Sequence, residues 1–231
     1  MNDFNVKFGI IGIDHRHVYT QTQFLVELGA ELVGWYTEGS PTTLGGFTKR
    51  FPKAKRFADP RSLLEDPDIK VILTSAVPND RAKISISAMK HGKDVMSDKP
   101  GCLSFGDLKE LRQTVQQTGR IWSVDFSERF EVPAVTLATN LVSDGAIGDV
   151  IHTLGLGPHR LNAESRPNWF FDPNKNGGIL ADIGSHQIDQ FLFFTKSERT
   201  EITLASIRNM GHQEFTNFSD FGEIALRSKT A

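Results

Sequence analysis

Residues 6–17 read VKFGIIGIDHRH, a short apolar run that leads directly into a polar turn. The apolar part, residues 6–13, is typical of a strand that is buried on both faces, as in a parallel sheet. Residues 18–29 follow with Val18, Leu25 and Val26 on one side of a predicted helix, and Gly29 stands where that helix ends. The order strand, turn, helix predicts the first unit of an α/β sheet.

The same alternation continues to about residue 126. Further strands are predicted at 31–37, 69–76, 94–97 and 120–126, with helices at 62–65, 80–91 and 104–118. Strands and helices in this order predict a doubly wound Rossmann sheet with right-handed crossovers. Ligands of such sheets bind beyond the carboxyl ends of the strands, so the candidate site residues are those that follow each strand.

The second half of the chain has a different pattern. It predicts helices at 133–142 and 182–195, strands at 150–157, 201–208 and 221–227, and a polar, aromatic loop at 158–178. Because few helices separate these strands, an antiparallel arrangement is expected. The fold class is therefore α/β: a Rossmann domain over residues 1–123, and an α+β substrate-binding and oligomerisation domain with an open, mostly antiparallel sheet over residues 124–231.

The composition excludes several classes of protein. The chain has 231 residues, of which 39% are hydrophobic and 23% are charged, and its net charge is −2. It lacks the basic excess that nucleic-acid or anionic-membrane partners require. The single cysteine, Cys102, excludes an intrachain disulfide. No signal peptide and no membrane-spanning run is recognisable, so we expect a soluble, cytoplasmic protein.

The turn after the first strand is a degenerate form of the dinucleotide-binding G-x-G-x-x-G motif. Only Gly12 is present, while Asp14 and His17 take the places of the other two glycines. A carboxylate repels a diphosphate, but the basic side chains of residues 15–17 and the amides of the following helix would offset this. On these residues alone, a turn without a ligand is equally compatible with the pattern. After the second strand, Glu38 is suited to bind the ribose hydroxyls of NAD and to repel the 2′-phosphate of NADP, or it only begins a turn.

Three further segments carry a family resemblance. Residues 75–79 read SAVPN, residues 93–100 read KDVMSDKP and residues 177–189 read GGILADIGSHQID. In this order they resemble the Gfo/Idh/MocA family of sugar and cyclitol dehydrogenases. His15-x-His17 and residues 157–160 (GPHR) are similar to a branch of that family of the trehalose-utilisation type. The resemblance implies a nicotinamide cofactor, NAD or NADP, on a Rossmann domain and a sugar or polyol substrate on the second domain.

The chain also departs from the family pattern. Asp98 replaces the usual Glu, and Ala82 stands where many members have His. The sequence ends before further strands that relatives usually have, which indicates a truncated or a minimal member. A sheet that ends there has an open edge, so the resemblance implies a homo-oligomer that associates through the C-terminal sheet.

The residues expected around the cofactor follow the ends of the predicted strands, and the resemblance adds those of the Pro-Asn and Asp-Lys-Pro segments. They are Gly12, Ile13, Asp14, His15, His17, Thr37, Glu38, Ser75, Pro78, Asn79 and Asp98.

Three residues are candidates for catalysis. Asp182 and His186 are four apart, so on a helix they share one face, and an imidazole is a suitable base near neutral pH. The alternative is a capping Asp and a core His, which the residues alone favour and the resemblance disfavours. Lys99 follows the fourth strand and is suited to hydrogen-bond the reacting oxygen. Its alternative is an exposed surface lysine.

The substrate is expected to contact Lys99, Asp182, His159, Arg160 and Trp169, because a sugar site combines an aromatic face with polar groups. A packed loop around a core Trp is an equally good alternative. No run has the spacing of a dedicated metal site, so no metal is expected. The sequence therefore predicts an NAD(P)-dependent sugar or polyol dehydrogenase. The alternatives are a non-catalytic protein on the same fold that senses a sugar or nucleotide, and an inactive remnant.

Overall fold

The computed structural model describes residues 6–229. The chain divides into two compact units, Met1–Asp125 and Phe126–Ala231. The sequence places this division two residues earlier, after residue 123. Within residues 6–229, no helix is both long enough and apolar enough to cross a membrane.

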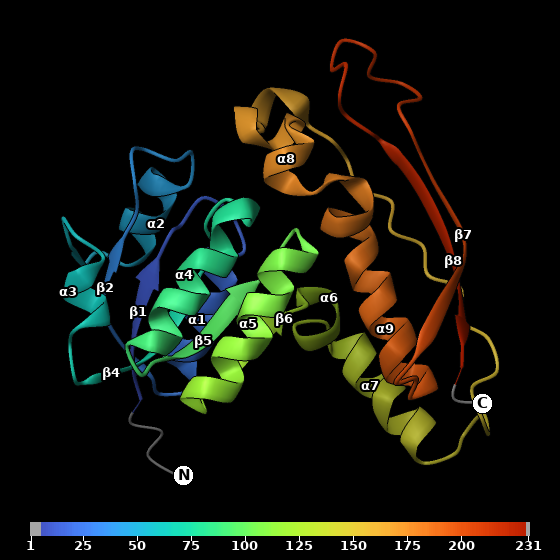
Figure 1. Ribbon diagram of the computed structural model, residues 1–231, viewed down its shortest axis with the longest axis horizontal. Coiled ribbons are helices and arrows are strands. Elements are labelled where there is room, and N and C mark those ends of the chain that lie inside the picture. Colours follow the sequence, from blue (N-terminus) through green and yellow to red (C-terminus); the bar gives the residue numbers. More distant parts are fainter. Residues whose placement is uncertain (1–5, 230–231) are drawn as a thin grey trace. The chain divides into compact units, whose positions relative to one another are not determined.

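The first unit is built on one six-stranded sheet in the order β3-β2-β1-β4-β5-β6 (Figure 1). All its neighbouring strands pair in parallel. The chain leaves the centre of the sheet in one direction after β1 and returns to the other side at β4, which is the doubly wound topology that the sequence predicts. The strands are β1 (Lys7–Ile11), β2 (Glu31–Tyr36), β3 (Lys55–Arg56), β4 (Ile69–Thr74), β5 (Asp94–Asp98) and β6 (Trp122–Asp125).

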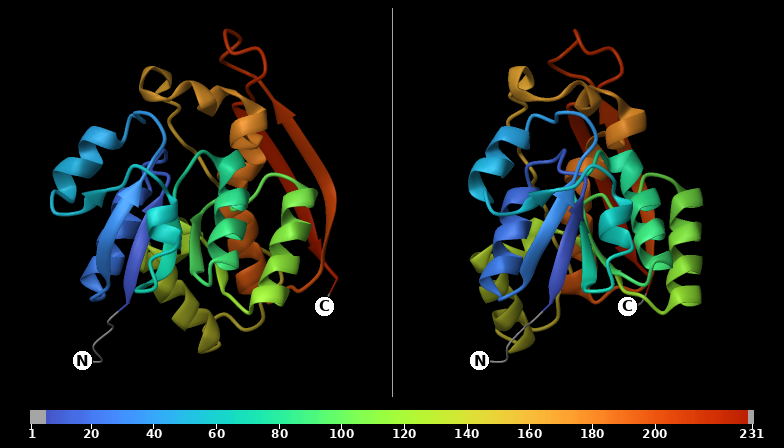
Figure 2. Two further views of the ribbon diagram at one scale, coloured as in Figure 1. Left: turned by 60° about the vertical axis from the view of Figure 1, so that its left-hand side comes forward. Right: turned by 90° about the vertical axis from the view of Figure 1, so that its left-hand side faces the viewer.

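Helices cover both faces of this sheet (Figure 2). Neighbouring residues of one strand point to opposite faces, so Ile10 packs in the core with Val18 while Ile11 packs in the other core with Leu111. The two apolar layers explain why the strands are continuous apolar runs in the sequence. The helices are α1 (Val18–Glu27), α2 (Leu44–Arg50), α3 (Arg61–Leu64), α4 (Pro78–Lys90) and α5 (Phe105–Thr118).

The limits of α5 follow from its end residues. The Ser104 side chain accepts a hydrogen bond from the backbone amide of Asp107 at 3.0 Å, and Gly119 adopts the left-handed conformation at the other end. Both features are confirmed predictions of the sequence. By contrast, α2 and β3 are not predicted, because they are short and their sequences contain adjacent glycines or only charged residues.

The second unit combines helices with a two-stranded antiparallel sheet. The antiparallel pairing of β7 and β8 is a confirmed prediction. Its elements are α6 (Ser127–Phe130), α7 (Pro133–Ser143), η1 (Ala163–Ser165), η2 (Asn168–Phe171), α8 (Pro173–Asn176), η3 (Leu180–Gly184), α9 (Ser185–Thr195), β7 (Thr200–Arg208) and β8 (Phe221–Ser228). Arg129 of α6 forms an ion pair with Asp189 of α9 at 2.5 and 2.9 Å, which joins these two helices.

Two predictions for this unit are wrong. Residues 150–157 form neither strand nor helix. They pack against α9 instead, where a Cβ on Gly155 would lie 2.7 Å from Cγ of Gln187, so this backbone contacts a helix rather than a partner strand. The predicted helix 182–195 is regular only from Ser185, because residues 180–184 form the wider π-helical turn η3. Gly184, a poor former of α-helix, lies where the wide turn gives way to α9.

Candidate functional site

The turn after β1 is tied to the carboxyl ends of two neighbouring strands. The amide of Gly12 donates to the carbonyl of Tyr36 at 2.8 Å, and the amide of His15 donates to the carbonyl of Ser75 at 2.8 Å. Gly12 has φ +82°, and a Cβ there would lie 2.4 Å from the Cβ of Ala76. Only glycine fits this position, so the one glycine that the degenerate motif keeps is the one that the turn itself requires.

Asp98, at the end of β5, is completely buried and bonds three side chains. Its Oδ2 accepts from Nδ1 of His15 at 2.7 Å and from Nη2 of Arg81 at 3.0 Å, and its Oδ1 accepts from Nδ1 of His17 at 2.9 Å. Although burial opposes ionisation, Arg81 and the two histidines hold the pKa of Asp98 well below its usual range. The carboxylate is therefore enclosed by side chains of its own unit, and its direct partners are Arg81 and the two histidines of the β1–α1 turn.

The two histidines differ in their surroundings. The side chain of His15 is 14% exposed and that of His17 is 27% exposed, and their rings meet edge to face with centroids 4.3 Å apart. Burial lowers the pKa of His15 to about 4, even though the neighbouring Asp98 carboxylate favours the charged form. His15 is therefore neutral near pH 7, with Nδ1 as the donor to Asp98.

Arg81 is a site residue that the sequence analysis missed. This α4 side chain is buried, and it donates to the carbonyls of Ala76 at 2.8 Å and of Pro100 at 3.2 Å, and also to that of Lys99. Together with its ion pair to Asp98, these bonds connect the end of β4 to the end of β5. Arginine is usually exposed, so a single Arg on a predicted helix carries no signal for such a position.

Lys99 lies directly after β5 and is only 3% exposed. Its alternative as an exposed surface lysine is therefore wrong. A lysine is almost never fully buried without a compensating interaction. The burial of Lys99 therefore indicates that the Asp98–Lys99 segment belongs to the interior of the site and not to a surface turn.

The three side chains of His15, His17 and Asp98 offer possible ligand atoms for a metal within 4.8 Å of one another. However, the nitrogen–oxygen distances of 2.7 and 2.9 Å are those of hydrogen bonds. The Arg81 guanidinium also lies 3.0 Å from the same carboxylate, so a metal cation bound there would be repelled. We therefore assign this cluster as a hydrogen-bonded network around an ionised Asp98.

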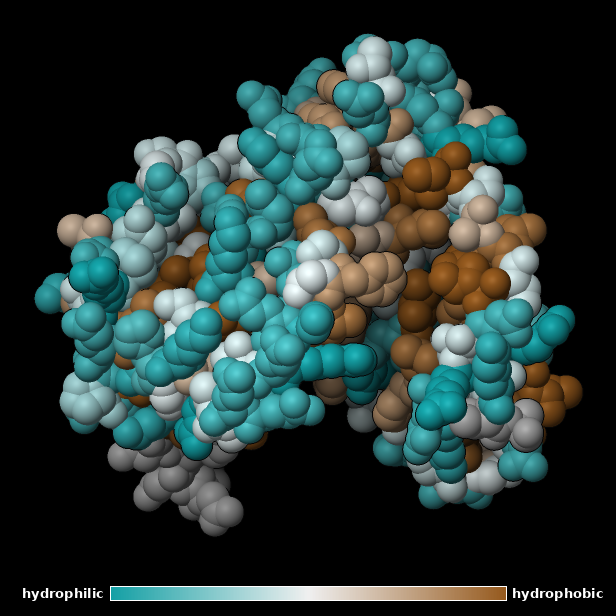
Figure 3. All heavy atoms as spheres, in the orientation of Figure 1, coloured by the Kyte–Doolittle hydropathy of each residue, from teal (hydrophilic) through white to brown (hydrophobic). Residues whose placement is uncertain are grey.

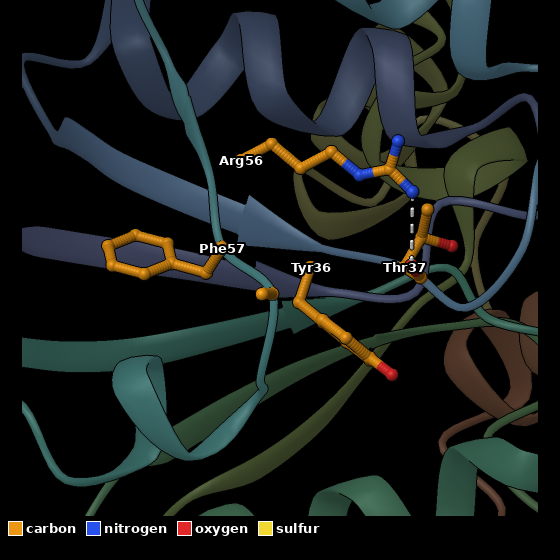
Figure 4. A pocket seen from close by; sticks show the side chains of 5 residues that line it. Tyr36, Thr37, Arg56 and Phe57 are labelled. Atoms are coloured by element: carbon orange, nitrogen blue, oxygen red, sulfur yellow. Dashed lines mark hydrogen bonds between the residues drawn. The ribbon is translucent and has the colours of Figure 1, made fainter.

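A cavity of about 330 Å³ lies at the carboxyl end of β2, where Figure 4 shows its lining side chains. Arg56 donates to the carbonyls of Thr37 at 3.5 Å and of Gly39 at 3.1 Å. The Thr37 hydroxyl is buried and has no hydrogen-bond partner among residues 6–229. Glu38, which follows it, is exposed. The lining residues are Tyr36, Thr37, Arg56, Phe57 and Ala58.

The amino-terminal end of α4 carries a second unsatisfied group. Pro78 begins the helix, and the buried Oδ1 of Asn79 has no hydrogen-bond partner in the part of the chain that the structure describes. Buried polar atoms are normally bonded, so those of Asn79 and Thr37 are consistent with a polar ligand along the carboxyl edge of the sheet. On this observation, the residues present fit a nicotinamide dinucleotide.

Asp14 is the residue of the turn that opposes such a ligand. Burial raises the pKa of Asp14 to about 6, with Asp80 and Glu38 adding to the shift and Arg81 opposing it. The side chain is therefore ionised above about pH 6, and the repulsion of a diphosphate that the sequence predicts applies in that range.

The second unit contains a cavity of about 160 Å³ of its own. Of the predicted substrate residues, His159, Arg160 and Asp182 line it. Trp169 is not among its lining residues and lies against Phe170, with ring centroids 6.1 Å apart. His186, 2% exposed in α9, also lies outside the lining, and its ring meets the edge of Phe126 at 6.2 Å.

The same cavity has a histidine–carboxylate pair that the sequence analysis missed. Nδ1 of His212 bonds Oδ2 of Asp220 at 2.7 Å, and both residues line the cavity. The backbone amide of Met210 and the His212 side chain lower the pKa of Asp220 to about 2. These residues belong to the loop between β7 and β8, where no periodic pattern or motif marks them.

Two family models match the chain. Residues 6–126 match the model of an oxidoreductase family with an NAD-binding Rossmann fold, and residues 135–230 match the Gfo/Idh/MocA C-terminal domain. The chain belongs to the Gfo/Idh/MocA oxidoreductase family. The first match includes the β1–α1 turn, the end of β2 and the Asp98–Lys99 segment, and the second includes Asp182 and His186.

Individual relatives of this Gfo/Idh/MocA chain include dehydrogenases. A levoglucosan dehydrogenase of Pseudarthrobacter phenanthrenivorans is 32% identical over 66% of this chain and 40% of that protein. An NAD⁺-dependent scyllo-inositol 2-dehydrogenase of Bacillus subtilis is 29% identical over 63% of this chain and 41% of that protein. The matches thus span about two fifths of the length of these two curated relatives.

Solved structures agree with the fold. The crystal structure of a protein from Erwinia carotovora atroseptica superposes on this chain with a TM-score of 0.95 at 36% sequence identity. The alignment covers 98% of this chain and 68% of that protein's chain. A myo-inositol 2-dehydrogenase from Lactobacillus plantarum has a TM-score of 0.82 at 21% identity and covers 97% of this chain and 67% of that chain. At its lower identity, the second structure shows the fold alone.

Proposed function

We propose that this chain is an NAD(P)-dependent oxidoreductase that transfers a hydride between a nicotinamide cofactor and a hydroxyl-bearing carbon of a sugar or polyol. The observation that supports this most is the carboxyl edge of the parallel sheet, where Thr37 and Asn79 leave buried polar atoms unbonded near the turn of Gly12. The levoglucosan and inositol dehydrogenases among its relatives support the class of substrate.

In this proposal the cofactor lies along the carboxyl ends of β1, β2, β4 and β5. Gly12, Ile13 and Ser75 provide backbone at the turn, while the side chains of Asn79 and Thr37 face polar groups of the nucleotide. When bound, the nicotinamide ring supplies the hydride acceptor or donor. Asp98 acts indirectly, since its oxygens hold His15 and His17.

The substrate hydroxyl loses its proton to His186, and the ammonium of Lys99 stabilises the developing alkoxide. A base of this kind contributes about 10²- to 10⁴-fold to the rate. Asp182, His159 and Arg160 orient the sugar, since they line the cavity of the second unit, and His212 adds an imidazole to the same lining. Trp169 is proposed as an aromatic contact of the sugar at the edge of this region.

Two charged residues act in opposite directions on the choice between NAD and NADP. Glu38 favours NAD, since a carboxylate binds ribose hydroxyls and repels a 2′-phosphate. Arg56 lines the cavity at the end of β2, but its guanidinium already bonds two backbone carbonyls. We therefore propose NAD as the preferred cofactor.

A titration with both cofactors tests the proposal. NADH and NADPH are added separately to the native chain, and energy transfer from tryptophan to the nicotinamide is measured. Trp35 lies in β2 and Trp122 in β6, so the Rossmann unit has its own donors. Saturable binding that is tighter for NADH is expected, and no binding of either nucleotide would overturn the proposed function.

Sugars, disaccharides and inositols are then screened as substrates by nicotinamide absorbance. Binding without any turnover would favour the sensory alternative.

Asp14→Asn is expected to tighten NADH binding at about pH 8 by about fivefold, because removing one carboxylate near a diphosphate is worth about 1 kcal/mol. The gain should disappear at about pH 5, where the native carboxyl group is protonated, since its pKa is raised to about 6. Fluorescence titrations of both proteins at the two pH values measure this. Equal affinities at about pH 8 would show that the diphosphate avoids the turn.

The stability of the same variant provides a second measurement. Because the folded-state pKa of Asp14 is raised from 3.8 to about 6, the folded protein holds its proton more tightly than the unfolded chain. The native protein therefore loses stability as the pH rises through that window. Asp14→Asn removes this loss, so its melting temperature should exceed that of the native protein at about pH 8 and match it at about pH 4.

We also propose that the chain forms a homo-oligomer through its C-terminal sheet. The β7–β8 hairpin exposes Ile202, Leu204, Ile207 and Phe221, and Figure 3 shows hydrophobic side chains at the surface of this unit. The register places Leu204 and Phe221 on one face of the hairpin and Ile202 and Ile207 on the other, and exposed apolar side chains that gather in this way are typical of association surfaces. Sedimentation at micromolar concentration should give a mass above that of one chain. A stable, well-behaved monomer would contradict the proposal.

A further inference from the structure

The histidine cluster of the β1–α1 turn has too little positive charge for an anionic ligand when both imidazoles are neutral. Asp98 contributes one negative charge and Arg81 one positive charge, so the pair is neutral overall. Asp14 adds a second carboxylate to the same turn, while Arg16 of the turn and Lys99 near His15 add two positive charges. A nucleotide diphosphate brings two further negative charges, so next to this turn the side chains are one positive charge short, and an additional cation besides the helix amides would balance it.

Of the two imidazoles, that of His17 can become the cation at the smaller cost. It is the more exposed ring, and its Nδ1 is held by Asp98 at 2.9 Å, so Nε2 is the ring nitrogen left to bond a ligand. His15 is more deeply buried, and the positive charge of Lys99 also disfavours the charged form of its ring. Imidazole changes its charge between about pH 5 and 8, and a phosphate oxygen within hydrogen-bond distance favours the charged form.

We infer that His17, anchored by Asp98, binds the diphosphate of the cofactor as an imidazolium, so that cofactor binding takes up one proton from solution. The inference rests on the proposed function, because it requires a nicotinamide dinucleotide as the ligand. In the bound state, Nδ1–H donates to Asp98 and Nε2–H donates to a phosphate oxygen. His17 stands at the third glycine place of the usual motif, where the glycine serves close packing of helix and strand, so its imidazole adds a phosphate contact that the usual motif does not have there.

Several charged groups surround this imidazole, and each is included in the expected pH dependence. Asp98 of β5 bonds this ring, Arg81 of α4 bonds the same carboxylate, and His15 and Arg16 are its neighbours in the turn. Asp14, near Asp80 and Glu38, also takes up protons below about pH 6. The uptake by His17 must therefore be separated experimentally from that by Asp14.

Isothermal titration calorimetry with NADH measures the uptake directly. The native chain is titrated at about pH 7.5 in two buffers of different ionisation enthalpy, and the difference in observed heat gives the number of protons bound. Close to one proton per NADH is expected, together with an affinity that falls by up to about tenfold per pH unit between about pH 7 and 8.5.

Three variants assign the proton. His17→Gln keeps a hydrogen-bond donor without a titratable group and should lose most of the uptake and of the pH dependence. Asp14→Asn should keep the uptake. His91→Gln, the matched control, replaces an exposed imidazole that bonds the carbonyl of Ser87 at the end of α4, and should behave as the native chain. Uptake that survives in His17→Gln, or that is lost in Asp14→Asn, would overturn the inference.

A measurement on the native chain keeps the test independent of whether His17→Gln folds. The ring signals of the seven histidines are followed by NMR over pH with and without NADH. One signal is expected to titrate at a higher pH when NADH is bound, and through-bond assignment of the native spectrum should identify it as that of His17. If NADH binds but no signal moves, only this inference fails. If neither NADH nor NADPH binds, the proposed function fails and the inference with it.

Discussion

Asp98→Ala is expected to lower the free energy of unfolding by about 3 to 5 kcal/mol, because it leaves the buried Arg81 without its counter-ion. The carboxylate is fully buried and bonds Arg81, His15 and His17 within 3.0 Å. Its removal takes away all three bonds at once and leaves an uncompensated guanidinium charge in the interior. Urea denaturation at about pH 7 gives the change.

A matched control is Asp68→Ala. Asp68 also forms an ion pair at 3.0 Å, with Lys7, but its side chain is 66% exposed. Water screens an exposed ion pair of this kind, so this variant should differ little in stability from the native chain. Similar losses in the two variants would show that the Asp98 network does not stabilise the fold. The low pKa of Asp98 adds a pH dependence: its contribution is present near neutral pH and is lost as the pH falls through the folded-state value.

His186→Ala is expected to lower kcat by about 10²-fold or more on a verified substrate, because a general base acts mainly in the transition state. The affinity for the cofactor should stay nearly unchanged. The kcat/KM profile of the native chain should have a limb that reports the ionisation of the base, and this limb should be absent from the variant. The readouts are steady-state kinetics with nicotinamide absorbance and a separate NADH titration.

Two further variants make this test specific. Lys99→Ala should lower kcat and also raise KM, since the ammonium contacts the substrate oxygen both before and during hydride transfer. His152→Ala removes an exposed imidazole of the same unit and should leave the kinetics unchanged. Full activity of His186→Ala would place the base elsewhere, with His159 and His212 of the second unit's cavity as the next candidates.

Local features of the chain are what the sequence could determine. The apolar run before Gly12, the capping serine at 104 and the glycine at 119 act within a few residues, so their patterns predict a strand, a helix start and a helix end. Summed along the first half, these signals predict the parallel sheet and its carboxyl edge. They also place Asp98 and Lys99 at a strand end, where ligands of such sheets bind.

The tertiary structure alone decided which charged groups meet. The bonds from Asp98 to Arg81, His17 and His15 join residues that are 17, 81 and 83 positions apart, and no periodicity connects such positions. These meetings change the chemistry of the groups: Arg81 and the two histidines keep the buried Asp98 an anion although burial opposes its ionisation, and burial keeps His15 neutral. The predicted strand at 150–157 fails for the same reason, because whether an apolar segment forms a ladder or packs on a helix depends on which partner the rest of the chain brings to it.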